Sequence, residues 1–150
     1  VSNAYPLRKK LIKEVNKLPN VDVLKHPGYH RLGCYTPKYL ETLSRYKISI
    51  CTSSMYGYAL RKIIESTACG CIVLTDLPIE DNLPEIDDNL VRINSNWDIK
   101  SISNLIKDLY SSYNPDKQKY LSEKCINYYR YEEIGRRLVN DIENLRVNYN

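Results

Sequence analysis

Apolar residues recur along this 150-residue chain at two spacings, one typical of helices and the other of buried strands. The first repeat has helical spacing and consists of Leu7, Leu11, Val15 and Leu18. Pro6 suits the first turn of that helix, and Pro19 marks its end. The short apolar run 21–24 then predicts a first strand, which leads into a loop at 25–35.

The middle of the chain predicts a helix, a strand, a second helix and a second strand in turn. Thr36 and Pro37 form a cap and first-turn signal for the first of these helices, and 48–51 is the strand that follows it. A small polar loop at 52–58 precedes the second helix. Gly70 ends that helix, because glycine readily takes the left-handed conformation found at helix C-termini. The apolar run 71–74 then has the character of a parallel strand covered on both faces.

Three helices are predicted at the end of the chain. Asp98 or Ser101 caps the first, and Asn114-Pro115 ends it. The second runs from about 116 to 129. The third has apolar residues at helical spacing: Ile134, Leu138, Ile142 and Leu145.

Strands and helices therefore alternate up to a last strand at 90–93, which follows an acidic loop at 76–89. This order predicts right-handed crossovers and an α/β fold: a Rossmann-like parallel sheet with helices on both faces and a helical C-terminal end. Ligands of such sheets bind beyond the carboxyl ends of the strands. The expected ligand-binding segments are the start of the first helix and the loops 25–35, 52–58 and 76–88.

Composition narrows the class of partner. The net charge is +4, which suits an anionic small ligand or a peripheral contact with an anionic membrane surface. It does not reach the dense basic stripe of a nucleic-acid-binding protein, so no nucleic acid partner is expected. No apolar run is long enough to span a membrane.

The five cysteines are scattered and contain no C-x-x-C pair. Cys51, Cys69 and Cys71 fall in or beside predicted buried elements, which indicates reduced core cysteines in a cytoplasmic protein. Cys69 and Cys71 lack further ligands at a spacing that a metal site would need.

The segment 53–75 concentrates the candidate chemistry. Arg61 and Lys62 open a helix, where the helix dipole favours negative charge instead. A bound anion would be held there by free helix N–H groups and by Lys62 together. One turn later, Glu65 could accept hydrogen bonds from hydroxyls. The alternative is a solvated helix face with a weak pair between Lys62 and Glu65.

A second group of cations stands at the start of the first helix, where Arg8, Lys9, Lys10 and Lys13 crowd together. Parallel topology places this helix start and that of Arg61 and Lys62 at the same edge of the sheet. Cations then gather where a helix dipole also attracts anions. The sequence therefore predicts a phosphate or diphosphate ligand.

The run 60–76 resembles the nucleotide-sugar-binding segment of group 1 glycosyltransferases of the GT-B fold. Its pattern is a basic residue, two apolar residues, Glu65, then Ala68-x-Gly70 and a strand. Tyr5 to Arg8 and the aromatic-basic stretch 128–138 are similar to the CgeB type. The resemblance covers nearly the whole chain, but only as the C-terminal half of such an enzyme. We therefore expect 1–150 to be a single donor-binding domain, with a first strand and an N-terminal domain preceding Val1.

The resemblance implies a glycosyltransferase that moves a hexosyl group from a UDP- or GDP-sugar donor to an acceptor hydroxyl. Glu65 would hold the ribose hydroxyls, Lys62 and Arg61 would meet the diphosphate, and Arg8 would approach the diphosphate from the other side. The donor sugar and phosphates would be lined by Ser53, Ser54, Tyr56 and Gly57. The loop from His26 to Tyr29 would pack on the base.

The resemblance also implies what this half would lack. No metal or other cofactor is expected, because helix dipole and cations hold the diphosphate. The acceptor, a glycan, lipid or protein, would bind mainly to the N-terminal domain. This half is therefore not expected to be active alone, and its own catalytic residues are not identified.

One position departs from the family pattern. Many relatives carry a second glutamate eight residues before the one at Glu65, and here that position is Gly57. The departure motivates an alternative, a non-catalytic nucleotide-binding or scaffold domain of the same fold. A response-regulator-like domain is disfavoured, because Lys25 and His26 follow the first predicted strand where an acidic cluster would be needed.

Two smaller features have ordinary interpretations. His26 and His30 lie in a loop, where histidine is most often a surface or packing residue, although His26 could donate to a phosphate or base beside an anion site. Asp87 and Asp88 form a short acidic pair without further ligands, which indicates a solvated turn and not a metal site.

Overall fold

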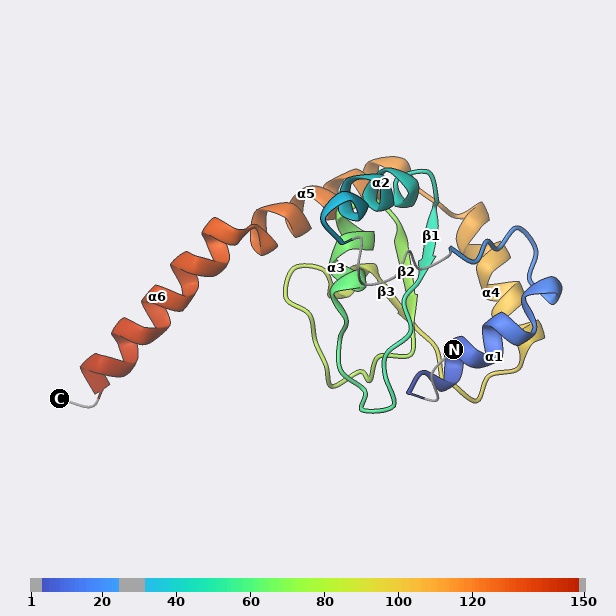
Figure 1. Ribbon diagram of the computed structural model, residues 1–150, viewed down its shortest axis with the longest axis horizontal. Coiled ribbons are helices and arrows are strands. Elements are labelled where there is room, and N and C mark those ends of the chain that lie inside the picture. Colours follow the sequence, from blue (N-terminus) through green and yellow to red (C-terminus); the bar gives the residue numbers. More distant parts are fainter. Residues whose placement is uncertain (1–3, 25–31, 149–150) are drawn as a thin grey trace.

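The computed structural model describes residues 4–24 and 32–148, with side chains described for 4–24 and 37–146 (Figure 1). Within these ranges the sheet has three parallel strands in the order β1-β2-β3: β1 (Ile48–Ile50), β2 (Ile72–Thr75) and β3 (Leu90–Arg92). Ile48 lies opposite Ile72, and Val73 lies opposite Leu90. The α/β class and the parallel sheet are thus as expected, but the sheet is small.

The central strand contributes to two separate cores, because successive side chains of a strand point to opposite faces. Leu74 packs on one face with α1 (Pro6–Lys13) and α4 (Ile99–Ser111), in a cluster with Leu7, Leu11, Leu18, Ile93, Ile99, Ile102 and Ile106. Val73 packs on the other with α3 (Arg61–Ala68) and α5 (Pro115–Tyr129), in a cluster with Cys51, Ile63, Leu77, Ile86 and Cys125. Helices on both faces of the sheet, as expected from the sequence, are confirmed.

The strand predicted at 21–24 is wrong. This segment is irregular, and its Val23 and Leu24 are exposed. Only Val21 packs against a core, and the segment is tied to the protein through Asp22, whose carboxylate accepts a hydrogen bond from the Tyr46 hydroxyl at 2.9 Å. A strand needs backbone pairing along its length, and two apolar side chains that face solvent give little drive toward it.

The start predicted for the second helix is also wrong. Helix α2 (Leu32–Leu43) begins before Thr36 and Pro37, so that Pro37 lies inside it. Proline has no N–H and cannot pair with the carbonyl four residues earlier, which is why a mid-helix proline is usually unfavourable. The backbone of α2 therefore runs through a residue that typically begins a helix.

The other helix boundaries follow local signals. Pro6 stands at the start of α1, which is followed by the short 3-10 helix η1 (Val15–Lys17). Asp98 caps α4, its Oδ1 accepting from the Ser101 backbone N–H at 2.8 Å. Asn114 caps α5 by accepting from the Lys117 N–H, and Pro115 occupies the first turn. A second 3-10 helix, η3 (Asp87–Asn89), leads into β3.

The cysteines whose side chains are described have the core role expected of them. Cys51, Cys71 and Cys125 are buried free thiols, and Cys69 is half-buried. Burial raises the pKa of Cys71 to about 12 and that of Cys125 to about 11, so both thiols are neutral at physiological pH. The side chain of Cys34 lies outside the described part.

The last helix, α6 (Tyr131–Asn148), extends away from the rest of the molecule (Figure 1). Only Arg130 separates it from α5. Of the helices described, none combines the length and the apolar character needed to cross a membrane.

Candidate anion-binding site

Small hydroxyl residues line the carboxyl edge of the sheet, directly after β1. Thr52, Ser53 and Ser54 are only 2%, 4% and 6% exposed. The Ser53 backbone N–H donates to Oδ1 of Asp76, the residue after β2, at 2.6 Å. The Ser53 hydroxyl donates to the Asp76 carbonyl at 3.4 Å. These bonds join the ends of two neighbouring strands and fix the position of the loop that follows β1.

Arg8 reaches this edge from the first turns of α1. Its Nε donates to Thr52 Oγ1 at 3.1 Å, and its guanidinium lies 4.1 Å from the centre of the Tyr5 ring, within cation–π range. The Met55 N–H donates to the Ala4 carbonyl at 2.7 Å, which ties the loop after β1 to the residues before α1. The sequence prediction that Arg8 lies beside loop 52–58 is therefore consistent with the structure.

Lys62 brings a second cation to the same edge from the first turn of α3. Although part of the side chain is exposed, burial of the amine lowers its pKa, and the positive charge of Arg8 lowers that pKa further. Leu60, at the N-cap of α3, supplies no side-chain acceptor for the first helix N–H groups. Backbone donors and two cations thus share one region.

Neither of these two cations forms an ion pair with a described acidic side chain, although the charge of Glu65 acts on Lys62 from a longer distance. The ion pairs of the described part of the chain involve neither Arg8 nor Lys62. A cation whose pKa is lowered by a neighbouring cation is stabilised by an added anion, because the anion offsets both the repulsion and the lost hydration. The arrangement is therefore suited to binding a negatively charged group.

Glu65 and Arg61 are placed differently from the expectation. Arg61 Nε lies 2.8 Å from Glu65 Oε1, an i,i+4 pair on the surface of α3. The carboxylate is mostly buried while the guanidinium is mostly exposed, so the pair contributes little to stability. Arg61 is thus directed along its own helix toward Glu65, and a ligand hydroxyl at Glu65 would share that carboxylate with Arg61.

Gly57 adopts a backbone conformation that favours glycine. Its φ is +70°, and a Cβ at this position would lie 3.2 Å from Cγ of Pro78. Its N–H donates to the Ser54 carbonyl at 2.9 Å, and the Tyr56 N–H donates to Ser54 Oγ at 3.2 Å, so the turn is closed by its own bonds. Gly57, where many relatives of the resembled family carry a second glutamate, therefore has a backbone conformation that a residue with a Cβ would strain.

Replacing Gly57 with alanine is expected to destabilise the protein by about 1–2 kcal/mol, because left-handed backbone is unfavourable for residues with a Cβ. Gly70→Ala is the matched control, since Gly70 has a φ of +79° but nothing within 4 Å of an added Cβ. Urea unfolding measures the loss of stability in each variant. The difference between the two losses reports the contact with Pro78. A neutral Gly57→Ala would show that this turn readily changes conformation.

Two residues important to this edge were not singled out from the sequence. Thr52 accepts the Arg8 hydrogen bond, and Asp76 braces Ser53. Both directly follow a strand, which was the available signal. Tyr56 and its neighbours Met55 and Tyr58 carry exposed side chains on the same loop.

Two of the predicted site residues, His26 and Tyr29, are outside the described residues. Asp87 is held by Arg92 at 2.7 Å, and this guanidinium keeps the pKa of the Asp87 carboxyl below its usual value. Asp87 therefore stabilises the turn before β3. In the described part of the chain, no group of three or more His, Cys, Asp or Glu side chains is placed to hold a metal ion.

A separate basic hollow of about 450 Å³ lies between η1 and α4. It is lined in part by Lys17, Lys100 and Lys107, but also by Glu14 and Asp98. Lys17 pairs with Glu14 at 2.7 Å. Because its charges are largely compensated, this hollow is a weaker candidate for an anion than the edge occupied by Arg8 and Lys62.

Comparisons of the chain with models of known protein families, with curated proteins and with solved structures give no match.

Proposed function

We propose that this chain is the donor-binding domain of a glycosyltransferase of the GT-B fold and binds the diphosphate of a nucleotide sugar. The observation that carries the proposal is the placement of two cations, Arg8 and Lys62, near one edge of the sheet. They come from the first turns of separate helices, the charge of Arg8 lowers the pKa of Lys62, and no described acidic side chain forms an ion pair with either. The resemblance of the run 60–76 to nucleotide-sugar-binding segments supplies the ligand class.

The proposed role of the site is electrostatic. In glycosyl transfer, the bond from the sugar anomeric carbon to the diphosphate oxygen breaks with its electron pair, and the acceptor hydroxyl oxygen bonds to that carbon as it loses its proton. Negative charge builds on the departing diphosphate. Arg8, Lys62 and the first N–H groups of α3 would stabilise that charge in place before the reaction begins.

Glu65 would orient the nucleoside part of the donor. A carboxylate is a suitable acceptor for a ribose diol. Because Oε1 already pairs with Arg61, the hydroxyls would use the remaining oxygen Oε2 or displace Arg61. The buried hydroxyls of Ser53 and Ser54 would face the phosphates and sugar from the other side of the site.

Titration of the chain with UDP and GDP by isothermal calorimetry tests the proposal. Binding is expected for at least one of them and not for the uncharged nucleosides, because the cations recognise the diphosphate. Lys62→Ala and Glu65→Ala should each weaken binding by about 10-fold or more. The matched control is Lys107→Ala, which removes a lysine from α4, on a different side of the sheet. If Lys62→Ala and Glu65→Ala bind like the parent, the site assignment is wrong.

A second candidate, favoured by the backbone at Gly57, is a non-catalytic nucleotide-binding or scaffold domain. It predicts the same diphosphate binding without turnover of a donor. Donor hydrolysis or sugar transfer by the chain joined to an N-terminal half of a GT-B enzyme would exclude this candidate. Binding without either activity would support it.

A further inference from the structure

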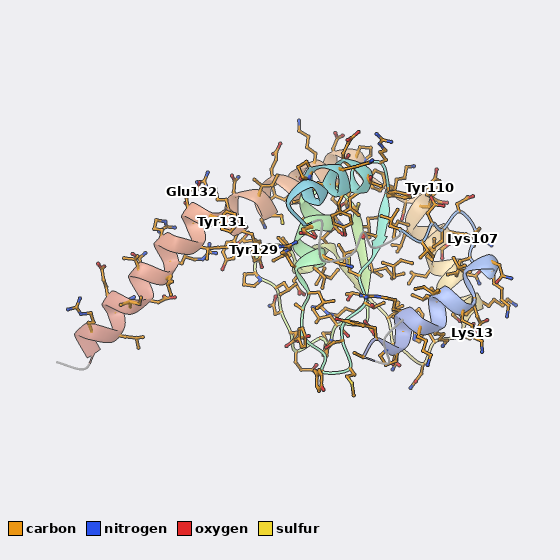
Figure 2. All side chains as sticks on the ribbon, viewed as in Figure 1. Lys13, Lys107, Tyr110, Tyr129, Tyr131 and Glu132 are labelled. Carbon is orange, nitrogen blue, oxygen red and sulfur yellow. The ribbon has the colours of Figure 1, made fainter. Side chains whose placement is uncertain are left out.

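Helix α6 carries an exposed apolar stripe with no described neighbour over it. Ile134, Leu138, Ile142 and Leu145 are 42%, 59%, 48% and 57% exposed, and Tyr131 is more exposed still. Figure 2 shows Tyr131 and Glu132 on the helix as it leaves the body, beyond Tyr129, whose hydroxyl donates to the Pro84 carbonyl at 3.0 Å. Most helices in proteins are stabilised by packing of their apolar face, and α6 lacks such packing along this stripe.

The width of the stripe indicates what kind of surface covers it. At about 100° per residue, these five side chains fall within a sector of roughly 80°. A helix that packs on a broad core usually presents a wider apolar face, whereas a narrow stripe is typical of a seam between two helices. The stripe is therefore matched to another helix.

Gly135 borders the stripe, and no described residue packs against it. A glycine inside a helix costs about 1 kcal/mol relative to alanine. Nothing lies within 4 Å of where its Cβ would be, so no contact in the described structure explains it. A glycine at such a position lets a second backbone or a long side chain approach closely.

We propose that two copies of this chain associate through antiparallel pairing of their α6 helices. Arg137 and Asp141 flank one side of the stripe, one turn apart. In an antiparallel pair each flank faces the same flank of the other helix, so Arg137 of each copy meets Asp141 of the other. Arg137 also donates to the Tyr128 carbonyl at 2.9 Å and stacks on the Tyr128 ring, which leaves guanidinium N–H groups for this contact.

The same register matches the apolar positions. It places Ile134 opposite Leu145 and Leu138 opposite Ile142, and it sets Gly135 against the long side chain of Arg146. The antiparallel arrangement puts the two globular bodies at opposite ends of the helix pair, whereas a parallel one would crowd them at one end (Figure 1).

The charge of α6 argues against a membrane surface as the occupant. The described side chains of the helix include four acidic residues and three arginines: Glu132, Glu133, Asp141, Glu143, Arg136, Arg137 and Arg146. Interfacial helices typically have a polar face rich in cations. The proposal does not depend on the function of the anion-binding edge.

Sedimentation equilibrium from about 1 to 500 µM tests the pairing, a range that spans weak dimers. The parent should form dimers, and Leu138→Lys should weaken the dimer by about 100-fold, by burying a charge in the seam. Asn140→Lys is the control, because Asn140 is exposed on the face of the helix opposite the stripe and its replacement should leave the dimer intact. Circular dichroism checks that both variants keep their helix content.

A charge exchange tests the antiparallel register. Arg137→Asp and Asp141→Arg should each weaken the dimer, because each places like charges opposite one another. The double variant should restore it, and an equimolar mixture of the two single variants should form a heterodimer, because positions 137 and 141 of the two copies then carry opposite charges at both contacts. The proposal is overturned by a parent that stays monomeric, by a dimer indifferent to Leu138→Lys, or by no rescue in the double variant. A monomer that instead binds phosphatidylglycerol vesicles through Leu138 also overturns it.

Discussion

Replacing both Arg8 and Lys62 with alanine is expected to lower the affinity for UDP or GDP by about 100-fold or more. Hydrogen bonds to charged groups contribute about 1.5–3 kcal/mol each, and two such groups address one diphosphate. The two residues also repel each other in the free protein, as the lowered pKa of Lys62 indicates. The double variant therefore isolates the feature on which the proposed function depends.

The control for this experiment removes two cations elsewhere. Figure 2 shows Lys13 on α1 and Lys107 on α4, two helices that pack in the same core. Lys13→Ala with Lys107→Ala changes the net charge by the same amount and should lower affinity by less than about 3-fold, because exposed charges are screened by salt. An equal loss in the two double variants would mean that net charge alone attracts the ligand.

The pH dependence of binding gives an independent readout of Lys62. The bound diphosphate favours the protonated amine, and the pKa of this amine in the free protein lies below its ordinary value. Affinity should therefore be fully present well below that lowered pKa and fall as the pH rises through it. Lys62→Arg should retain affinity to higher pH, because a guanidinium stays charged.

Much of the fold could be predicted because its signals are local. Asp98 and Asn114 cap helices through bonds to N–H groups three residues away, and Pro115 supports a helix start by its own geometry. The apolar run before Asp76 forms the central strand, since few other arrangements bury four consecutive side chains. Alternation of these elements then indicated parallel topology.

The two wrong predictions concern segments whose structure depends on contacts with residues far away in the sequence. Whether 21–24 pairs as a strand depends on what lies beside β1. Val23 and Leu24 are exposed and do not pack in a core. Pro37 gave a helix-start signal, yet α2 continues through it. Neither outcome is encoded in the spacing of nearby residues.

The sequence could predict at which edge of the sheet the candidate site lies, but not which of its side chains form ion pairs. Topology alone placed Arg8 and Lys62 at the same end of the sheet. The pair expected on this helix joined Glu65 to Lys62, three residues away, although Arg61, four residues away, is also within reach of Glu65. In the structure Glu65 pairs with Arg61, whereas Lys62 forms no described ion pair, and its pKa is lowered by burial and by the charge of Arg8.

Replacing Ile63 with alanine is expected to destabilise the protein by about 2–5 kcal/mol, the usual range for such truncations in a core. Ile63 is fully buried, and it packs with Val73 of the central strand and Cys125 of α5. The deletion leaves a cavity where α3 meets the sheet, and domains of this size are typically stable by only about 5–15 kcal/mol.

Urea unfolding followed by circular dichroism measures this loss, with Ile126→Ala as the control. Ile126 is half exposed on α5, so its truncation should cost less than about 1 kcal/mol. Because Lys62 keeps its place on α3 while the protein stays folded, the affinity of Ile63→Ala for a diphosphate should change little at low urea. A cost for Ile63→Ala no larger than that for Ile126→Ala would contradict the packing of α3 against the sheet, and with it the rigid placement of Lys62 beside Arg8.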